Sequence, residues 1–189
     1  MKRDRKRRQW IVAVCLVAVL ALAAGGLPIA VRELYPLRYT ETIEACAAAC
    51  DITPSLLYGV VRTESRFRAE AESSAGAKGL MQLTEAAFLE AQKKRDGSVT
   101  LSVESMTDPT VNLTYGSYYL ALMLRSFSDV STALAAYNAG PNRVRGWLSN
   151  TDYSTDGETL THIPYPETAD YVERVLLAQR VYRRMYSIE

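Results

Sequence analysis

The sequence has few of the residues that build metal sites and disulfide frameworks. Its 189 residues include one histidine, His162, and three cysteines. This is too few for a site with several histidine ligands or for a small domain stapled by disulfides. The glycine-rich phosphate-binding patterns G-x-x-x-x-G-K-[ST] and G-x-G-x-x-G are also missing. The sequence therefore predicts no metal site and no cofactor.

Most of the chain has no excess of basic residues over acidic ones. The first eight residues hold six of the 22 basic residues and one of the 21 acidic residues, and residues 9–31 carry no charge. Residues 32–189 therefore hold 16 basic and 20 acidic residues, a net charge of −4. Because nucleic-acid binding needs a basic face that neutralises phosphates, we expect no nucleic-acid partner.

One long uncharged stretch is present, from Trp10 to Ala30. As a helix its 21 residues would be about 31 Å long, which matches the roughly 30 Å hydrocarbon core of a bilayer. The basic residues before it would stay in the cytoplasm. We therefore predict a cytoplasmic tail over residues 1–9, a single transmembrane anchor or uncleaved signal over 10–31, a linker over 32–41 and an extracytoplasmic domain over 42–189.

Two other interpretations of the apolar stretch remain open. Ala21-Leu22-Ala23 matches the small-residue pattern of a signal-peptide cleavage site. Cleavage there would still export the domain but would release it from the membrane. The remaining interpretation is a helix buried in the core of the fold.

Proline and glycine mark the ends of several predicted helices. Helix starts, with an N-cap residue or a proline at the first helical position, are indicated at Thr53-Pro54, Asp108-Pro109, Ser128 or Asp129, and Pro166-Glu167. The second helix is expected to end near Phe127, and the third at Gly140. Residues 95–107 and 149–165 have the composition of loops, and no stretch alternates as a strand would. We predict an all-α domain of six to eight short helices.

Glu64 is the most informative single residue. It continues the apolar stripe of Leu57, Val60 and Val61 at helical spacing, so its carboxyl is expected to be half-buried. Burial favours the neutral form of a carboxyl group, which prepares it to act as a general acid. The alternative is a carboxylate paired with one of the nearby arginines, which are Arg62, Arg66 and Arg68.

Three other segments combine glycine, amide and phenol groups. They are GAKGLMQ at 76–82, AAYNAG at 135–140 and IPYPETADYV at 163–172. Glycine permits a close approach of ligand to backbone, and amides and phenols suit sugar hydroxyl and N-acetyl groups. Taken singly, each of these side chains could equally be a core or helix-capping residue.

In this order, Glu64-Ser65, GAKGLMQL at 76–83, AAYNAG and IPYPETADYV resemble the SLT-type lytic transglycosylases, relatives of goose-type lysozyme. The resemblance runs over roughly residues 42–187. It implies a lysozyme-like helical fold and cleavage of the β-1,4 bond between N-acetylmuramic acid and N-acetylglucosamine in peptidoglycan glycan strands, leaving 1,6-anhydromuramyl ends. Leu83-Thr84-Glu85 and Asn142 depart from the pattern of the family, in loops outside the implied chemistry.

The resemblance also implies roles for particular residues. Glu64 would act first as acid and then as base, and Tyr171 would be the phenol that hydrogen-bonds to it and orients it. The residues implied to contact the saccharide are Ser65, Met81, Gln82, Tyr137 and Asn138.

Three other functions remain open. A hydrolytic lysozyme on the same fold would need a second acid in the cleft, for which Glu70, Glu72 and Asp170 are candidates. A non-catalytic peptidoglycan-binding module would not need Glu64. A structural helical bundle would explain none of the polar motifs. No protein partner is indicated.

Overall fold

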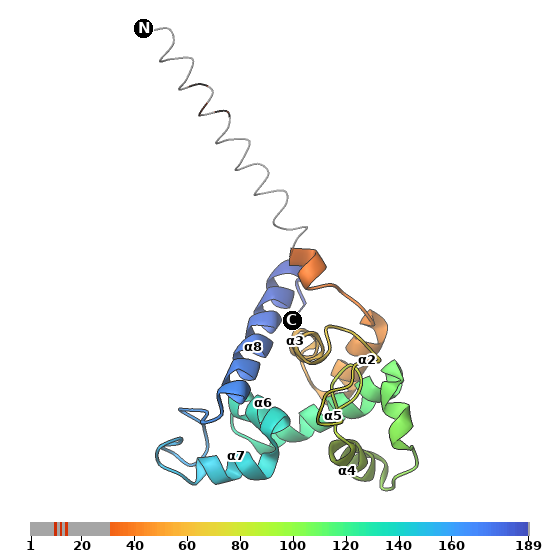
Figure 1. The fold of residues 1–189 in the computed structure, drawn as a ribbon, viewed down its shortest axis with the longest axis vertical. Helices are drawn as coiled ribbons and strands as arrows, with labels where there is room; N and C mark the ends of the chain where they lie inside the picture. The colour runs from red at the N-terminus through yellow and green to blue at the C-terminus, as the bar shows by residue number, and fades with distance from the viewer. Residues whose placement is uncertain (1–9, 11, 13, 15–30, 189) are drawn as a thin grey trace. The chain divides into compact units, whose positions relative to one another are not determined.

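The computed structural model describes residues 10, 12, 14 and 31–188. The chain divides into two compact units, residues 1–37 and residues 38–189, and the second contains all of the named helices. These are α2 (Thr40–Cys50), α3 (Pro54–Glu64), α4 (Glu85–Asp96), the 3₁₀ helix η1 (Val103–Thr107), α5 (Pro109–Ser126), α6 (Val130–Ala139), α7 (Pro141–Leu148) and α8 (Pro166–Tyr186) (Figure 1).

The prediction of a transmembrane helix over residues 10–31 is contradicted. Within the part of the chain that the structure describes, no helix combines the length and the apolar character needed to cross a bilayer. The described helical residues 31–34 include Arg32 and Glu33, whose charges are costly in hydrocarbon. Apart from Trp10, Val12, Val14 and Val31, the predicted span lies outside the described residues, as does the predicted tail over residues 1–9.

The all-α expectation agrees with the described residues, which form no strand and only two isolated β-bridges, Glu72 with Lys78 and Lys78 with Leu83. The capping signals also located the helix starts. Asp108 and Asp129 accept hydrogen bonds from the first-turn amides of α5 and α6 through their carboxylates. One predicted loop, 95–107, ends in η1 instead of being irregular throughout.

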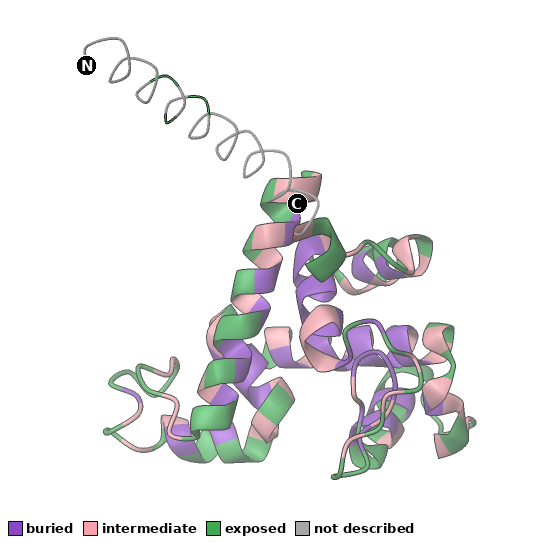
Figure 2. Ribbon diagram, turned by 45° about the horizontal axis from the view of Figure 1, so that its top comes forward, coloured by how far each residue is buried: buried purple, intermediate pink, exposed green. Residues whose placement is uncertain are grey.

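Helix α3 packs against α8, and this is the most extensive contact between two helices of the second unit (Figure 1). Gly59 allows the close approach, because a Cβ there would lie 2.9 Å from the carbonyl oxygen of Val175 on α8. The predicted inner stripe of α8, which runs from Tyr171 through Val175 and Ala178 to Tyr182, is buried. Figure 2 shows buried residues on one side of α8 and on the helices that lie beside it. The contact fixes the carboxyl end of α3, where Glu64 lies.

The chain reverses direction directly after α3. Arg66 and Phe67 both adopt left-handed backbone conformations, with φ of 53° and 61°. Such conformations are uncommon for residues with a side chain. Phe67 is 2% exposed, and its ring lies 6.2 Å from that of Tyr58, so burial of the ring anchors the turn. The turn leads into the segment of residues 76–84, which closes back toward α3.

Replacing Gly79 with alanine should strongly destabilise this segment. Gly79 has φ of 81°, and a Cβ there would overlap the Asn112 amide and the Met106 carbonyl oxygen. The left-handed conformation costs about 1–2 kcal/mol for an L-residue, and overpacking adds about 1–3 kcal/mol. Urea unfolding of Gly79→Ala should therefore show a clearly larger loss of unfolding free energy than Gly76→Ala. Gly76 has a similar φ of 77° but open space around it. Equal losses in the two variants would contradict this packing.

Candidate active site

A pocket of about 450 Å³ opens beside the carboxyl end of α3. It is built from α3, α4, α5, α6, α8 and the loop between α3 and α4. Its wall is formed by Glu64, Ser73, Ser74, Ala75, Ala77, Gln82, Leu83, Thr84, Ala87, Tyr119, Tyr137, Asn138, Ala139, Gly140 and Glu167. Four of the seven residues predicted from the sequence line this pocket, and these are Glu64, Gln82, Tyr137 and Asn138.

Glu64 is the last residue of α3 and is half-buried. Burial raises the pKa of its carboxyl from 4.5 to about 7, although Tyr171 and the positive charge of Arg174 both act to lower it. Within the described residues, Glu64 forms no ion pair with Arg62, Arg66 or another basic group. The carboxyl group therefore exchanges its proton near neutral pH, as a group that serves as both acid and base must.

Tyr171 lies behind the pocket wall on the first turns of α8 and is 3% exposed. Its hydroxyl has no partner at hydrogen-bond geometry among the described residues. It nevertheless lies close enough to Glu64 to lower the pKa of that carboxyl. Burial, and then the Glu64 charge, raise the pKa of Tyr171 well above its ordinary value.

Tyr137, on α6, is the second phenol near Glu64. Its hydroxyl donates a hydrogen bond of 2.8 Å to the carbonyl oxygen of Met81. Burial, the Glu64 charge and Tyr119 raise the pKa of Tyr137 well above its ordinary value. The rings of Tyr137 and Tyr119 lie 5.7 Å apart and both border the pocket, so two aromatic faces are available to a ligand.

Asn112 holds the segment of residues 78–83 in place from α5. Its side chain is fully buried and accepts a 2.7 Å hydrogen bond from the Met81 amide. It also donates to the carbonyl oxygens of Lys78, at 2.9 Å, and Met106, at 2.7 Å. Because Met81 in turn accepts from Tyr137, the buried amide fixes both the loop and the phenol. Asn112 is among the residues that resemble the family pattern, but no sequence pattern indicated this contact.

Ser65 and Met81 do not line the pocket. Ser65 is 1% exposed, and its hydroxyl contacts the carbonyl oxygens of Leu80, at 2.8 Å, and Val61, at 3.2 Å. The Met81 side chain is fully buried and presses against Gly116. Both residues shape the wall from behind.

Gln82 and Asn138 lie at the pocket surface with part of their hydrogen-bonding capacity already used. The Gln82 amide nitrogen donates to the carbonyl oxygens of Ala71, at 3.0 Å, and Gly79, at 3.1 Å. The Asn138 side-chain oxygen accepts from the Thr168 hydroxyl at 2.8 Å. The opposite ends of both amides, the Gln82 oxygen and the Asn138 nitrogen, form no hydrogen bond with another described residue and are available to polar groups of a ligand.

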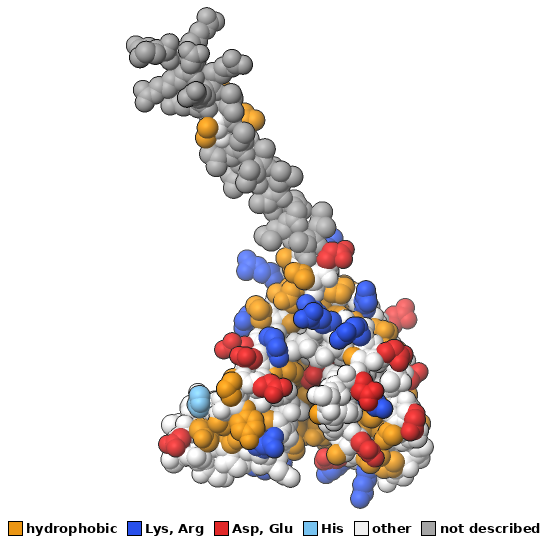
Figure 3. All heavy atoms as spheres, viewed as in Figure 1, with side chains coloured by type: hydrophobic (Ala, Val, Ile, Leu, Met, Phe, Trp, Pro, Cys, Tyr) orange, Lys and Arg blue, Asp and Glu red, His pale blue; other side chains and the backbone are white. Residues whose placement is uncertain are grey.

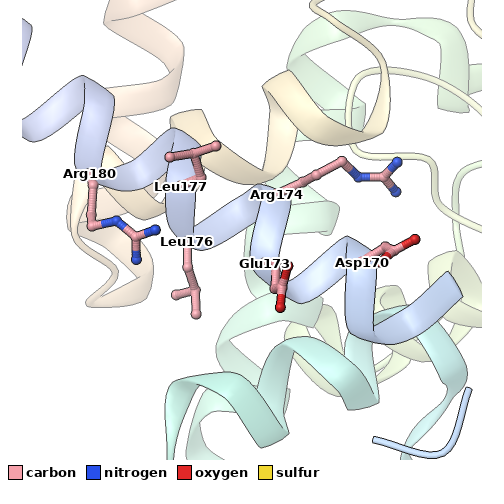
Figure 4. A pocket seen from close by; sticks show the side chains of 6 residues that line it. All are labelled: Asp170, Glu173, Arg174, Leu176, Leu177 and Arg180. Carbon is pink, nitrogen blue, oxygen red and sulfur yellow. The ribbon is translucent and has the colours of Figure 1, made fainter. Parts of the chain in front are cut away.

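Two carboxylates line the pocket, Glu64 and Glu167. Glu167 was not singled out from the sequence; its place in the first turn of α8 brings it there. The candidates for a second acid lie elsewhere. Glu72 pairs with Lys78 at 3.7 Å, and Asp170 borders a separate hollow of about 460 Å³ on the side of α8 (Figure 4). Glu70 is absent from the pocket wall.

No cluster of three potential metal ligands occurs among residues 31–188. Acidic and basic side chains are interspersed on the face of the second unit that Figure 3 shows. The chemistry that the arrangement supports is proton transfer by Glu64 next to a polar, aromatic-walled pocket.

The raised pKa of Glu64 predicts how stability depends on pH. Below pH 4.5 the carboxyl is neutral in both the folded and the unfolded chain, and between pH 4.5 and about 7 the unfolded chain ionises first. The unfolded state is therefore increasingly favoured as pH rises through this window. Glu64→Gln, which cannot ionise, should gain up to about 3 kcal/mol over the wild type between pH 4 and pH 8. Urea unfolding at several pH values measures this gain, and a difference that does not change with pH would show that Glu64 is not buried as described.

The chain is similar in sequence to known transglycosylases. Residues 41–159 match the family model described as transglycosylase SLT domain. The chain is 32% identical to the soluble lytic murein transglycosylase of Escherichia coli over 169 residues, which are 88% of this chain and 26% of that protein. It is 36% identical to the transglycosylase of Enterobacteria phage PRD1 over 127 residues, 67% of this chain and 43% of that protein.

The fold is similar as well. The crystal structure of the 70 kDa soluble lytic transglycosylase from Escherichia coli superposes with a TM-score of 0.74 at 30% identity, covering 89% of this chain and 28% of that one. The chain thus spans about a quarter of the length of the Escherichia coli relative. From the match over residues 41–159, the chain belongs to the transglycosylase SLT domain family.

Proposed function

We propose that the second unit is a peptidoglycan lytic transglycosylase that uses Glu64 as its single acid and base. The observation that carries the proposal is a carboxyl with a pKa of about 7 at the wall of a polar pocket, beside two phenols. Family membership supports the same reaction class. Because peptidoglycan lies outside the cytoplasmic membrane, this activity requires that the unit be exported.

In the proposed first step, protonated Glu64 donates its proton to the oxygen that links the muramyl residue to the next sugar. The bond from the anomeric carbon to that oxygen breaks, and the leaving sugar departs with a free hydroxyl. The muramyl ring carries the developing positive charge. The polar groups of Gln82, Tyr137 and Asn138 hold the saccharide in the pocket during this step.

In the second step, the Glu64 carboxylate takes the proton from the C6 hydroxyl of the same muramyl residue, and that oxygen bonds to the anomeric carbon. The product is a 1,6-anhydro ring, no water is consumed, and Glu64 returns to its protonated form. The attacking hydroxyl belongs to the substrate, so its effective concentration is high and a second carboxylate nucleophile is not required. The Tyr171 hydroxyl stabilises the carboxylate form between the two steps.

The full-length chain incubated with purified peptidoglycan should release fragments with 1,6-anhydromuramyl ends, which mass spectrometry identifies by the mass of one water less than a reducing end. Glu64→Gln keeps the volume of the side chain but removes the proton, so turnover should fall at least about 10²–10⁴-fold. A variant that keeps more than a tenth of the activity would exclude Glu64. Reducing ends in place of anhydro ends would instead indicate a hydrolase.

Tyr171→Phe should slow the reaction without loss of stability. The variant keeps the buried ring and removes a hydroxyl that has no partner at hydrogen-bond geometry among the described residues, so thermal unfolding should be unchanged or shifted upward. A hydrogen bond to a charged group contributes about 1.5–3 kcal/mol, so kcat/KM should fall roughly 10–150-fold.

The pH profile of the same variant gives an independent measurement. Because Tyr171 lowers the pKa of Glu64, its loss should raise that pKa, and the alkaline limb of the kcat/KM profile, where Glu64 loses the proton that it must donate, should move to higher pH. Tyr182→Phe on the same face of α8 serves as the control, since Tyr182 does not line the pocket. A Tyr171→Phe profile that overlies the wild-type profile would remove Tyr171 from the catalytic site.

A further inference from the structure

An arginine is held at the rim of the pocket by two contacts. The Arg143 guanidinium on α7 donates a 3.1 Å hydrogen bond to the carbonyl oxygen of Ala139, a residue of the pocket wall. It also lies over the ring of Tyr165, 5.3 Å from the ring centre. Tyr165 in turn packs against Trp147 at 5.1 Å. Together these contacts restrict the long side chain of Arg143 before any ligand arrives.

The charge of Arg143 is not neutralised by the protein. The side chain is exposed, and no carboxylate of residues 31–188 forms an ion pair with it. Tyr165 also remains 46% exposed. A restrained guanidinium and an open aromatic face therefore lie side by side, two residues before Glu167 of the pocket wall.

This pair suits a carboxylate. Guanidinium groups bind carboxylates through two parallel hydrogen bonds, and a side chain that is already restrained loses less entropy on binding. The N-acetyl sugars of a glycan strand are uncharged. The anionic groups of peptidoglycan are the carboxylates of the muramyl lactyl group when it is free, and those of the short peptides attached to it. On an intact strand the peptide carboxylates are the available anions.

We propose that Arg143 and Tyr165 form a subsite for a carboxylate of the peptide stem carried by the glycan strand. The proposal rests on the proposed function, because it assigns part of the same substrate to the rim of the same pocket. It makes Arg143 a specificity residue: the side chain binds the stem and takes no part in the proton transfers of Glu64.

The same helix provides a matched control. Arg145 also lies over an aromatic ring, 5.6 Å from the centre of Phe127, and donates a 3.1 Å hydrogen bond to Asn142. It borders a different hollow, of about 200 Å³, together with Glu90 and Lys94. Substitution of Arg145 removes the same charge from the same helix at a distance from the catalytic pocket wall.

The experiment compares two substrates and three proteins. The substrates are glycan strands that keep their peptide stems and stripped strands, from which an amidase has removed the stems and in which the lactyl carboxylates freed by that cleavage have been converted to neutral amides. The proteins are the wild-type full-length chain, Arg143→Gln and Arg145→Gln. For Arg143→Gln we expect kcat/KM to fall about fivefold on the peptide-bearing strands at low salt, which corresponds to about 1 kcal/mol. On stripped strands it should equal the wild type, and Arg145→Gln should equal the wild type on both.

Two further measurements separate a binding role from a structural one. Arg143→Lys keeps the charge but not the planar fork, so its activity on peptide-bearing strands should lie between those of the wild type and Arg143→Gln. The difference between Arg143→Gln and the wild type should also shrink as salt is raised, because exposed charge pairs are screened. Thermal unfolding of all variants serves as the folding control.

The outcomes distinguish the two proposals. If the wild type cleaves neither substrate, the proposed function fails. If the wild type cleaves peptide-bearing strands and Arg143→Gln matches it there, or if the variant loses the same factor on both substrates, the stem subsite is overturned while the proposed function stands. A wild type that cleaves only peptide-bearing strands supports the subsite when Arg143→Gln is slower on them and overturns it when the rates are equal.

Discussion

The placement of one carboxyl group, at the end of α3 and against α8, is the constraint on which the rest of the site depends. Burying Glu64 disfavours its charged form, and neither Tyr171 nor Arg174 fully offsets that cost, so the pKa of the carboxyl remains near 7. The α3–α8 contact that imposes this burial depends on Gly59, whose missing side chain lets the two backbones approach. Burial of Glu64 therefore lowers the stability of the folded chain at neutral pH, and it does so at the position where proton transfer would need a carboxyl with a raised pKa.

The wall opposite Glu64 is positioned by backbone groups as much as by side chains. Asn112 satisfies the amide of Met81 and the carbonyl of Lys78, Ser65 contacts the carbonyl of Leu80, and Tyr137 donates to the carbonyl of Met81. Every one of these bonds links segments far apart in the sequence. A buried amide with three partners is costly to disturb, because each lost bond leaves a buried polar group unpaired. The segment 78–83 is therefore a rigid part of the pocket wall.

Sequence reasoning succeeded where structure depends on neighbouring residues. The starts of α3, α5, α6 and α8 follow from capping residues and prolines, and the burial of Glu64 follows from its position on an apolar stripe. It failed where tertiary contacts decide: a shared motif located Ser65 and Met81 near the site but could not show that they face away from the pocket. Glu167 was missed because only the packing of α8 brings its first turn to the cleft. Hydropathy alone also predicted a membrane span that the described helices do not provide.

The two phenols near Glu64 are not equivalent, and the difference follows from their hydrogen bonds. The proton of Tyr137 is already donated to the Met81 carbonyl, so this hydroxyl can only accept a further hydrogen bond from a group in the pocket. The proton of Tyr171 has no acceptor with good hydrogen-bond geometry among the described residues, and Glu64 lies close to this hydroxyl. Tyr171 is therefore the phenol that can stabilise an ionised Glu64, whereas Tyr137 suits a donor such as a protonated carboxyl or a sugar hydroxyl. The Glu64 carboxyl is thus flanked by one hydroxyl that can donate a hydrogen bond, that of Tyr171, and one that can accept, that of Tyr137. Asn112 holds the backbone of Met81, and the Met81 carbonyl oxygen in turn keeps the proton of Tyr137 directed away from Glu64.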